Sequence, residues 1–185
     1  IVMKRFIIGI ISVVVGTAGS PILANAGATI DAVKARGAVI CGANGNRAGF
    51  SGLDSKGEWS GMDVDTCKAV AAAVLGDADK VQFVKTTSQT RFTALQTGEI
   101  DVLTRNVTWT LSRDAKLGID FVAPTFYDGQ GFMVNKNTGA TSVKDLGGAA
   151  VCVLPGSTSE KVTADVFKEN GLSYTPVVIE SKKEL

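Results

Sequence analysis

Hydrophobic and polar residues alternate along the chain in blocks that predict short helices and strands in turn. Residues 29–37 have the pattern of a short helix that Gly37 ends, and the apolar run over residues 38–44 predicts a buried strand. Turn-forming residues then gather within residues 50–61, which predicts a β-hairpin.

A longer helix is predicted over residues 61–76, which read GMDVDTCKAVAAAVLG. We expect Asp63 to cap its N-terminus through its side chain and Gly76 to end it. One face of this helix is apolar and carries Val64, Cys67, Ala71 and Val74.

The next blocks predict a strand over residues 80–86, a helix over 88–98 with Phe92 and Leu95 facing inward, and a strand over 100–105. This β-α-β-α-β order predicts an α/β fold with an open, mostly parallel sheet covered by helices. Ligands of such folds bind beyond the carboxyl ends of the strands. After an extended run over residues 121–136, a second cycle is predicted: helix 142–148, strand 149–156, helix 157–171 and strand 174–180.

The N-terminus has the layout of a secretory signal peptide. Lys4 and Arg5 precede an apolar run over residues 6–15, and Ala24-Asn25-Ala26 follows as a small-residue cleavage site. The alternative is a membrane anchor, but the apolar run is shorter than the roughly 20 residues that cross a bilayer. We therefore expect a signal peptide over residues 1–26, cleavage after Ala26, and export to the periplasm of a Gram-negative bacterium.

Charge and composition exclude several classes of function. The chain has 19 basic and 18 acidic residues, and without Lys4 and Arg5 there are 17 basic and 18 acidic residues. It therefore lacks the excess of positive charge that a nucleic-acid-binding protein needs. It contains no histidine, so the imidazole that a zinc site or a Ser-His or Cys-His catalytic relay needs is missing. We therefore expect no metal and no cofactor. In an exported chain, Cys41, Cys67 and Cys152 are possible crosslinks, with one left unpaired.

Two stretches each follow a predicted strand with small hydroxyl or amide residues. The first runs from Asn106 to Arg113, and the second is Gly156-Ser157-Thr158 at the start of a helix. The guanidinium of Arg113 suits a carboxylate, and Gly156 lets backbone approach a ligand closely. The alternatives are that Ser157 only caps its helix and that Arg113 pairs with Asp114 or Asp120.

Four segments in order resemble the polar amino-acid-binding proteins of bacterial ABC uptake systems, within extracellular solute-binding protein family 3, and most nearly the general L-amino-acid subgroup. The resemblance covers about residues 29–180, and the segments are GMDVDTCKAVAAAV, RFTALQTGEIDVLTRNVTWTLSRD, FYDGQGFMV and VCVLPGSTSE. It implies a type II periplasmic-binding-protein fold of two α/β lobes. Lobe one would span residues 27–131, a hinge-crossing strand 132–137, and a partial lobe two 138–185. The return crossing is absent, so we expect a C-terminally truncated chain.

The resemblance also implies roles for single residues. Arg113 would bind the ligand α-carboxylate, Thr108 would hydrogen-bond carboxylate and amine, and the Asn106 carbonyl would accept from the ammonium. On lobe two, Gly156, Ser157 and Thr158 would meet the same carboxylate. The expected ligand-binding set is completed by Asn44, Phe50 and Ser88.

One position departs from the family, because Arg47 stands where an apolar or aromatic residue commonly lines the side-chain pocket. The resemblance further implies a Cys41–Cys67 disulfide, and it implies that Cys152 pairs with a cysteine beyond this chain.

The implied function is the periplasmic binding of L-amino acids by a monomer that delivers them to an inner-membrane ABC permease. One alternative is a truncated remnant without function. Another is a cyclohexadienyl-type dehydratase on the same scaffold, which needs a carboxylate as general acid or base. The sequence places none beside Thr108 or Thr158, so no catalytic residue is predicted.

Overall fold

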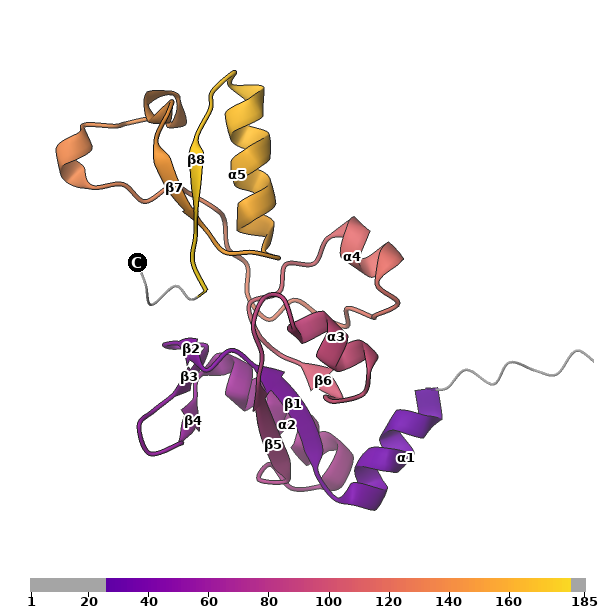
Figure 1. Ribbon diagram of the computed structural model, residues 1–185. Coiled ribbons are helices and arrows are strands. Elements are labelled where there is room, and N and C mark those ends of the chain that lie inside the picture. The colour runs from indigo at the N-terminus through magenta and orange to yellow at the C-terminus, as the bar shows by residue number, and fades with distance from the viewer. Residues whose placement is uncertain (1–25, 181–185) are drawn as a thin grey trace, which may run out of the picture.

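The computed structural model describes residues 26–180, and the predicted signal peptide lies outside this range except for Ala26. The described chain forms two α/β lobes, one above the other in Figure 1. Within residues 26–180, no helix is both long enough and apolar enough to cross a membrane.

Lobe one contains the predicted parallel sheet, which is confirmed. Its strands are β1 (Val39–Ala43), β5 (Val81–Lys85) and β6 (Val102–Leu103), in the order β5-β1-β6. Cys41 pairs with Phe83 on one side and with Val102 on the other, both in parallel register. The carboxyl ends of all three strands therefore meet at one edge, toward lobe two.

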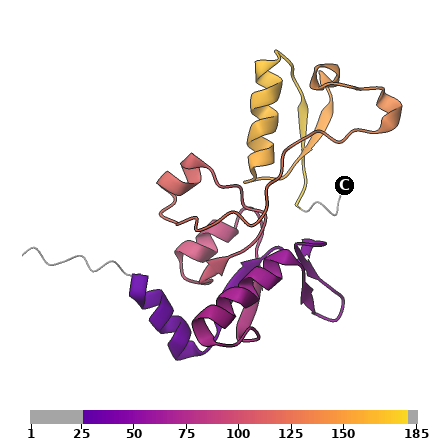
Figure 2. The ribbon, with the colours of Figure 1, turned by 180° about the vertical axis from the view of Figure 1, so that it is seen from behind.

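Helices cover both faces of this sheet (Figures 1 and 2). α2 (Met62–Leu75) contacts β1 and β5 on one face, and α3 (Arg91–Gln96) contacts β1 and β6 on the other. α1 (Ala26–Arg36) lies against α2, and its Val33 packs with Val39 and Ala71 in the buried core.

α2 confirms the predicted helix, but the predicted N-cap is wrong. The cap residue is Gly61, and Asp63 lies buried in the first turn, where its carboxylate accepts a hydrogen bond from Ser51 Oγ at 2.9 Å. Gly61 has φ 115°, and a Cβ there would come 2.4 Å from the carbonyl oxygen of Phe50. Contact with the preceding hairpin thus sets where α2 begins. At its other end Gly76 has φ 73° and closes the helix as predicted.

The predicted hairpin is β3 (Ser51–Leu53) paired antiparallel with β4 (Trp59–Ser60), and β2 (Asn46–Arg47) adds a third strand. Its turn is held by the Asp54 carboxylate, which accepts from the backbone N–H groups of Lys56 and Glu58 at 2.8 Å each.

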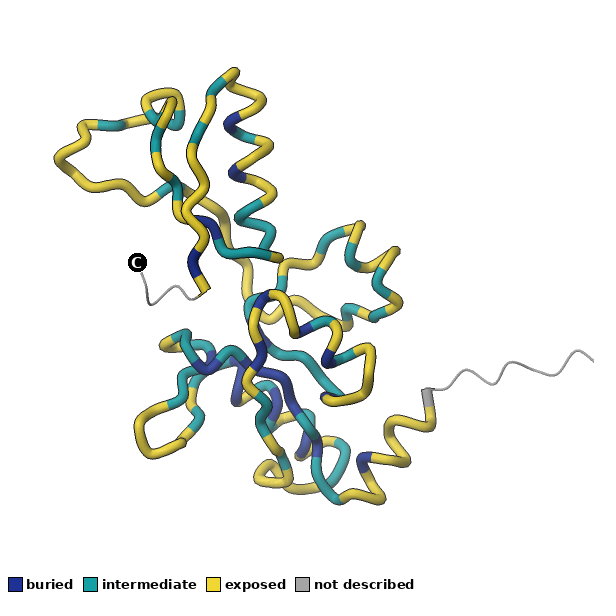
Figure 3. Tube along the Cα trace, in the orientation of Figure 1, coloured by how far each residue is buried: buried dark blue, intermediate teal, exposed yellow. Residues whose placement is uncertain are grey.

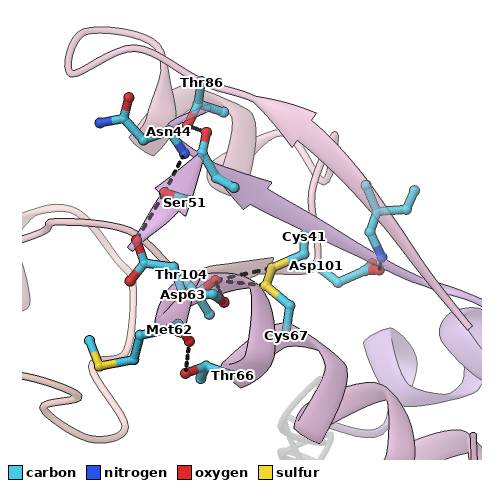
Figure 4. Close-up of a disulfide and its surroundings, with 12 residues drawn as sticks. Cys41, Asn44, Ser51, Met62, Asp63, Thr66, Cys67, Thr86, Asp101 and Thr104 are labelled. Carbon is cyan, nitrogen blue, oxygen red and sulfur yellow. Dashed lines mark hydrogen bonds between the residues drawn. A yellow bond between two sulfur atoms is a disulfide. The ribbon is translucent and has the colours of Figure 1, made fainter. Parts of the chain in front are cut away.

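The Cys41–Cys67 disulfide joins β1 to α2, as the resemblance implied (Figure 4). Thr104 Oγ1 donates to the carbonyl of Asp63 at 2.9 Å and contacts the sulfurs of both cysteines. β1, α2 and the end of β6 therefore form one fixed unit.

Lobe two is smaller. Its parallel strands β7 (Ala150–Val153) and β8 (Thr175–Val178) lie beside α5 (Thr158–Glu169), as predicted. Phe167 of α5 is buried and lies 5.8 Å from Phe132 and 4.7 Å from Tyr174 between ring centroids. Most of the buried residues nevertheless lie in lobe one (Figure 3).

The segment between the lobes contains α4 (Leu111–Lys116) and then an extended chain. Residues 132–135, where the hinge-crossing strand is predicted, are extended without strand pairing, and Lys136–Thr138 forms a 3₁₀ turn. The predicted helix over 142–148 is a 3₁₀ turn at Val143–Leu146, capped by Ser142.

Candidate functional site

Polar side chains gather where the parallel strands of lobe one end. Asn44 follows β1, Thr86 follows β5, and Arg105 and Asn106 follow β6. The Asn106 side-chain oxygen accepts from Asn44 Nδ2 at 3.0 Å, and Arg105 Nη1 donates to the carbonyl oxygen of Thr86 at 2.5 Å and to its hydroxyl at 3.2 Å. These bonds join the three strand ends, which is the position where α/β sheets bind ligands.

Arg91 belongs to this cluster although the sequence analysis did not select it. The residue is 2% exposed, its Nη1 donates to the Asn106 carbonyl at 3.0 Å, and its Nη2 donates to the Gly156 carbonyl at 3.2 Å. The Asn106 carbonyl, predicted to accept from a ligand ammonium, thus already has one donor and keeps a second lone pair.

The helix periodicity holds a signal for Arg91. Phe92 and Leu95 were expected to face inward, but they are only half-buried, whereas Arg91 and Ala94 are buried three residues apart. A charged residue on the buried stripe of a short helix marks a polar site beneath it.

Arg113 lies at the cleft between the lobes. Thr110 caps α4 and accepts from the Arg113 backbone N–H at 3.3 Å. The Arg113 guanidinium donates to the carbonyls of Thr108 at 2.9 Å and Gly156 at 3.3 Å, and its Cζ lies 5.1 Å from the centroid of the Phe92 ring. Among residues 26–180 no ion pair involves Arg113, so pairing with Asp114 or Asp120 is not what holds it.

The loop before α5 brings lobe two to the same place. Gly156 has φ 72°, and a Cβ there would come 3.1 Å from the carbonyl oxygen of Ser88, so glycine fits this approach best. Ser157 caps α5 by accepting from the Glu160 backbone N–H at 3.1 Å, while the Glu160 carboxylate accepts from the Gly156 N–H at 3.0 Å. The Thr158 and Thr108 hydroxyls, both in the predicted set, lie 2.9 Å apart across the two lobes.

The other predicted site residues lie at the edge of the same cleft. Phe50 makes an edge-to-face contact with Phe126, with ring centroids 5.2 Å apart, and Arg47 Cζ lies 5.5 Å from the Phe50 ring. Ser88 is buried, and its Oγ has no hydrogen-bond partner among the described residues.

Burial perturbs the charged groups of the cleft. Burial lowers the pKa of Arg91 to about 9, helped by repulsion from Arg105 and Arg113, and burial lowers the pKa of Arg105 to about 10. Both groups stay charged at neutral pH. Burial also raises the pKa of Asp63, although the Ser51 hydroxyl and the charges of Arg105 and Arg47 act in the opposite direction.

A continuous open hollow of about 2290 Å³ runs from α1 past the strand ends of lobe one to lobe two, and Ser88, Arg91, Arg113 and Thr158 are among its lining residues. Most small-molecule pockets measure about 300–1,000 Å³. The lobes therefore form an open groove, with cationic donors on lobe one and hydroxyls on both sides.

Fold and groove define a class: a solute-binding protein with two α/β lobes and a polar site between them. The sequence profile of the bacterial extracellular solute-binding proteins, family 3, matches residues 39–181, and the chain belongs to this family.

Curated relatives agree with this assignment. The chain is 57% identical to the glutamate/glutamine/aspartate/asparagine-binding protein BztA of Rhodobacter capsulatus, over 84% of this chain and 46% of that protein. It is 54% identical to the general L-amino acid-binding periplasmic protein AapJ of Rhizobium johnstonii, over 85% of this chain and 46% of that protein. The chain thus spans about half the length of the curated relatives it matches.

A solved structure shares the fold. A periplasmic binding protein of an ABC transporter from Brucella ovis, with glutathione bound, superposes with a TM-score of 0.78 at 51% identity, over 84% of this chain and 49% of that one. The predicted type II fold, with only part of a second lobe in this sequence, is confirmed by these similarities. The relatives named here are binding proteins rather than enzymes.

Proposed function

We propose that this chain binds L-α-amino acids in the periplasm for delivery to an inner-membrane ABC permease. The observation that carries the proposal is the position of Arg113, whose guanidinium faces the Gly156 loop of the opposite lobe beside Thr108 and Thr158. The names of the two curated relatives, which cover several amino acids, support the ligand class.

In this proposal Arg113 binds the α-carboxylate through charge-assisted hydrogen bonds. The neutral Gly156 carbonyl now accepts from Arg113, and a carboxylate makes shorter and stronger bonds to a guanidinium than a carbonyl does. The Thr108 and Thr158 hydroxyls, 2.9 Å apart, then bond the ligand from both lobes. The Asn106 carbonyl accepts from the ammonium with its free lone pair.

The expected binding free energies indicate what each lobe contributes. A micromolar ligand needs about −8 kcal/mol. Charge-assisted hydrogen bonds contribute about 1.5–3 kcal/mol each, so Arg113, Thr108 and one ammonium acceptor give about 4.5–9 kcal/mol together, and the cost of ordering the ligand takes up much of this. Closure of lobe two supplies the rest by adding hydroxyls and excluding water, and the closed shape signals occupancy to a permease.

A panel of the twenty L-amino acids, titrated into the purified protein and followed by calorimetry and by amide chemical shifts, tests the proposal. We expect saturable binding of several amino acids, with the largest shift changes at Thr108, Arg113 and Thr158. Absence of saturable binding for every amino acid overturns it. A matched titration with the decarboxylated amines serves as control, because these lack the group that Arg113 binds.

A further inference from the structure

Asp63 lies buried in the first turn of α2 and is fixed on three sides. Its carboxylate accepts from Ser51 Oγ at 2.9 Å, its backbone N–H donates to the Phe50 carbonyl at 2.8 Å, and its carbonyl accepts from Thr104 Oγ1 at 2.9 Å. Asp63 is 2% exposed, and no ion pair among residues 26–180 involves it. An apolar residue would avoid the cost of burying a carboxyl group here. The position of Asp63 therefore indicates a role beyond packing.

The Ser51 hydroxyl connects Asp63 to the end of β1. It donates to the Asp63 carboxylate and accepts from the backbone N–H of Asn44 at 3.2 Å (Figure 4). Because the hydroxyl hydrogen points to the carboxylate, a lone pair of the same oxygen faces the Asn44 N–H. Hydrogen bonds in such a chain polarise and strengthen one another. Ser51, which is 0% exposed, thus fixes the main chain of Asn44.

Asn44 in turn holds a residue of the candidate site. Its Nδ2 donates to the Asn106 side-chain oxygen at 3.0 Å, and its own side-chain oxygen accepts from the Asn46 backbone N–H at 3.3 Å. The Asn44 amide is therefore held by both its nitrogen and its oxygen. Asn106 is the residue whose carbonyl accepts from the ligand ammonium in the proposed complex.

These hydrogen bonds form a closed ring. Thr104, whose hydroxyl donates to the Asp63 carbonyl, lies just after β6 and two residues before Asn106. Asp63 is therefore connected to Asn106 by two paths, one through Ser51 and Asn44 and the other through Thr104 and the backbone. A displacement of Asn106 has to strain both paths, so the ring restricts this residue more than one path would.

We infer that Ser51 and Asp63 are positioning residues of the ligand site, which hold Asn44 and, through it, Asn106 in place for the ligand. This inference rests on the proposed amino-acid binding and adds two residues that act on affinity through Asn44. The hairpin and the first turn of α2 then contribute to binding although they lie behind the strand ends.

A double-mutant cycle tests the path from Ser51 to Asn44, with L-glutamine as ligand and calorimetry as the measurement. Ser51→Ala is expected to weaken binding by about 3- to 10-fold, since one hydrogen bond of the path is lost. In an Asn44→Ala background the path is already broken, so the same substitution is expected to change affinity by less than about twofold. Ser60→Ala, at an exposed position of β4 in the same hairpin, is the matched control and is expected to leave affinity unchanged.

The outcomes separate this inference from the proposed function. An equal loss from Ser51→Ala in both backgrounds overturns the positioning role and leaves amino-acid binding intact. Absence of binding by the wild-type protein for every amino acid overturns both.

Two substitutions of Asp63 give an independent comparison. Asp63→Asn keeps an oxygen that accepts from the Ser51 hydroxyl, whereas Asp63→Ala removes it. We expect Asp63→Asn to stay within about threefold of the wild-type affinity, and Asp63→Ala to lose about as much as Ser51→Ala. Urea unfolding midpoints show whether each variant is folded. Equal losses of affinity in two folded Asp63 variants contradict the inference.

A third measurement needs no ligand. In the ligand-free protein, Ser51→Ala is expected to shift the side-chain amide resonances of Asn44 and Asn106, because the ring connects all three residues. Ser60→Ala is expected to leave these resonances in place. An Asn106 resonance that Ser51→Ala does not move overturns the positioning role whether or not amino acids bind.

Discussion

Arg113 Nη2 donates a hydrogen bond to the carbonyl oxygen of Gly156 at 3.3 Å, although 43 residues separate the two in the sequence. The contact joins α4 to the loop before α5 and so links the two lobes at the proposed carboxylate site. In the proposed complex a ligand carboxylate would replace this neutral acceptor and form a shorter and stronger bond with the guanidinium.

Arg113→Ala is expected to weaken amino-acid binding by about 100-fold or more, because two charge-assisted hydrogen bonds of about 1.5–3 kcal/mol each are lost. Calorimetry measures the affinity. Lys116→Ala, on an exposed position of the same helix, removes an equal charge and is expected to have little effect. An unchanged affinity in Arg113→Ala would remove the central assignment.

Thr158→Val removes one of the two hydroxyls that meet across the lobes, with little change of shape. We expect binding to weaken by about 3- to 10-fold, since a neutral hydrogen bond contributes about 0.5–1.5 kcal/mol. Thr175→Val, at an exposed position of β8, is the control for the loss of a threonine hydroxyl. Equal affinities in the two variants would mean that the Thr158 hydroxyl does not take part.

Reduction of the Cys41–Cys67 disulfide is expected to lower the free energy of unfolding by about 3.5 kcal/mol, the chain-entropy value for residues 26 apart. Urea unfolding with and without reductant measures it. Cys152→Ser separates this effect from the free, exposed thiol and is expected to change neither curve. If reduction leaves the urea midpoint where it was, β1 and α2 do not depend on the bond.

The raised pKa of Asp63 implies that the stability of the protein depends on pH. Burial raises its pKa in the folded state, so the folded protein binds this proton more tightly than the unfolded chain. The resulting stabilisation is complete below the ordinary carboxyl pKa of about 3.9 and is lost as pH rises through the folded value. Relative to Asp63→Asn, the wild type should lose stability over that window in urea unfolding. A constant difference between the two proteins at all pH values would contradict this.

The sequence predicted the parallel sheet and most helices because the spacing of apolar residues depends on local secondary structure, which residues close in the sequence determine. The sequence also predicted Arg113 and the Gly156 loop as site residues, because small hydroxyl or amide residues follow the predicted strands there. Their roles in binding stay predictions.

Features that depend on distant neighbours were missed. Asp63 was expected to cap α2, but contact of Gly61 with Phe50 starts the helix earlier. Arg91 was overlooked because the inward face of α3 was assigned to the apolar Phe92 and Leu95, whereas the buried face carries Arg91 and Ala94. Its partners, the carbonyls of Asn106 and Gly156, come from two other segments.

The bond between Cys41 and Cys67 is made once, when the protein folds. Together with Thr104 it holds β1, α2 and the end of β6 in a fixed arrangement. The side chains at the carboxyl edge of the sheet are therefore also held in place. If the chain binds a solute as proposed, this part of the groove is already ordered before the solute arrives, and binding would not have to order it. The remaining entropy loss on binding would then fall on the smaller lobe.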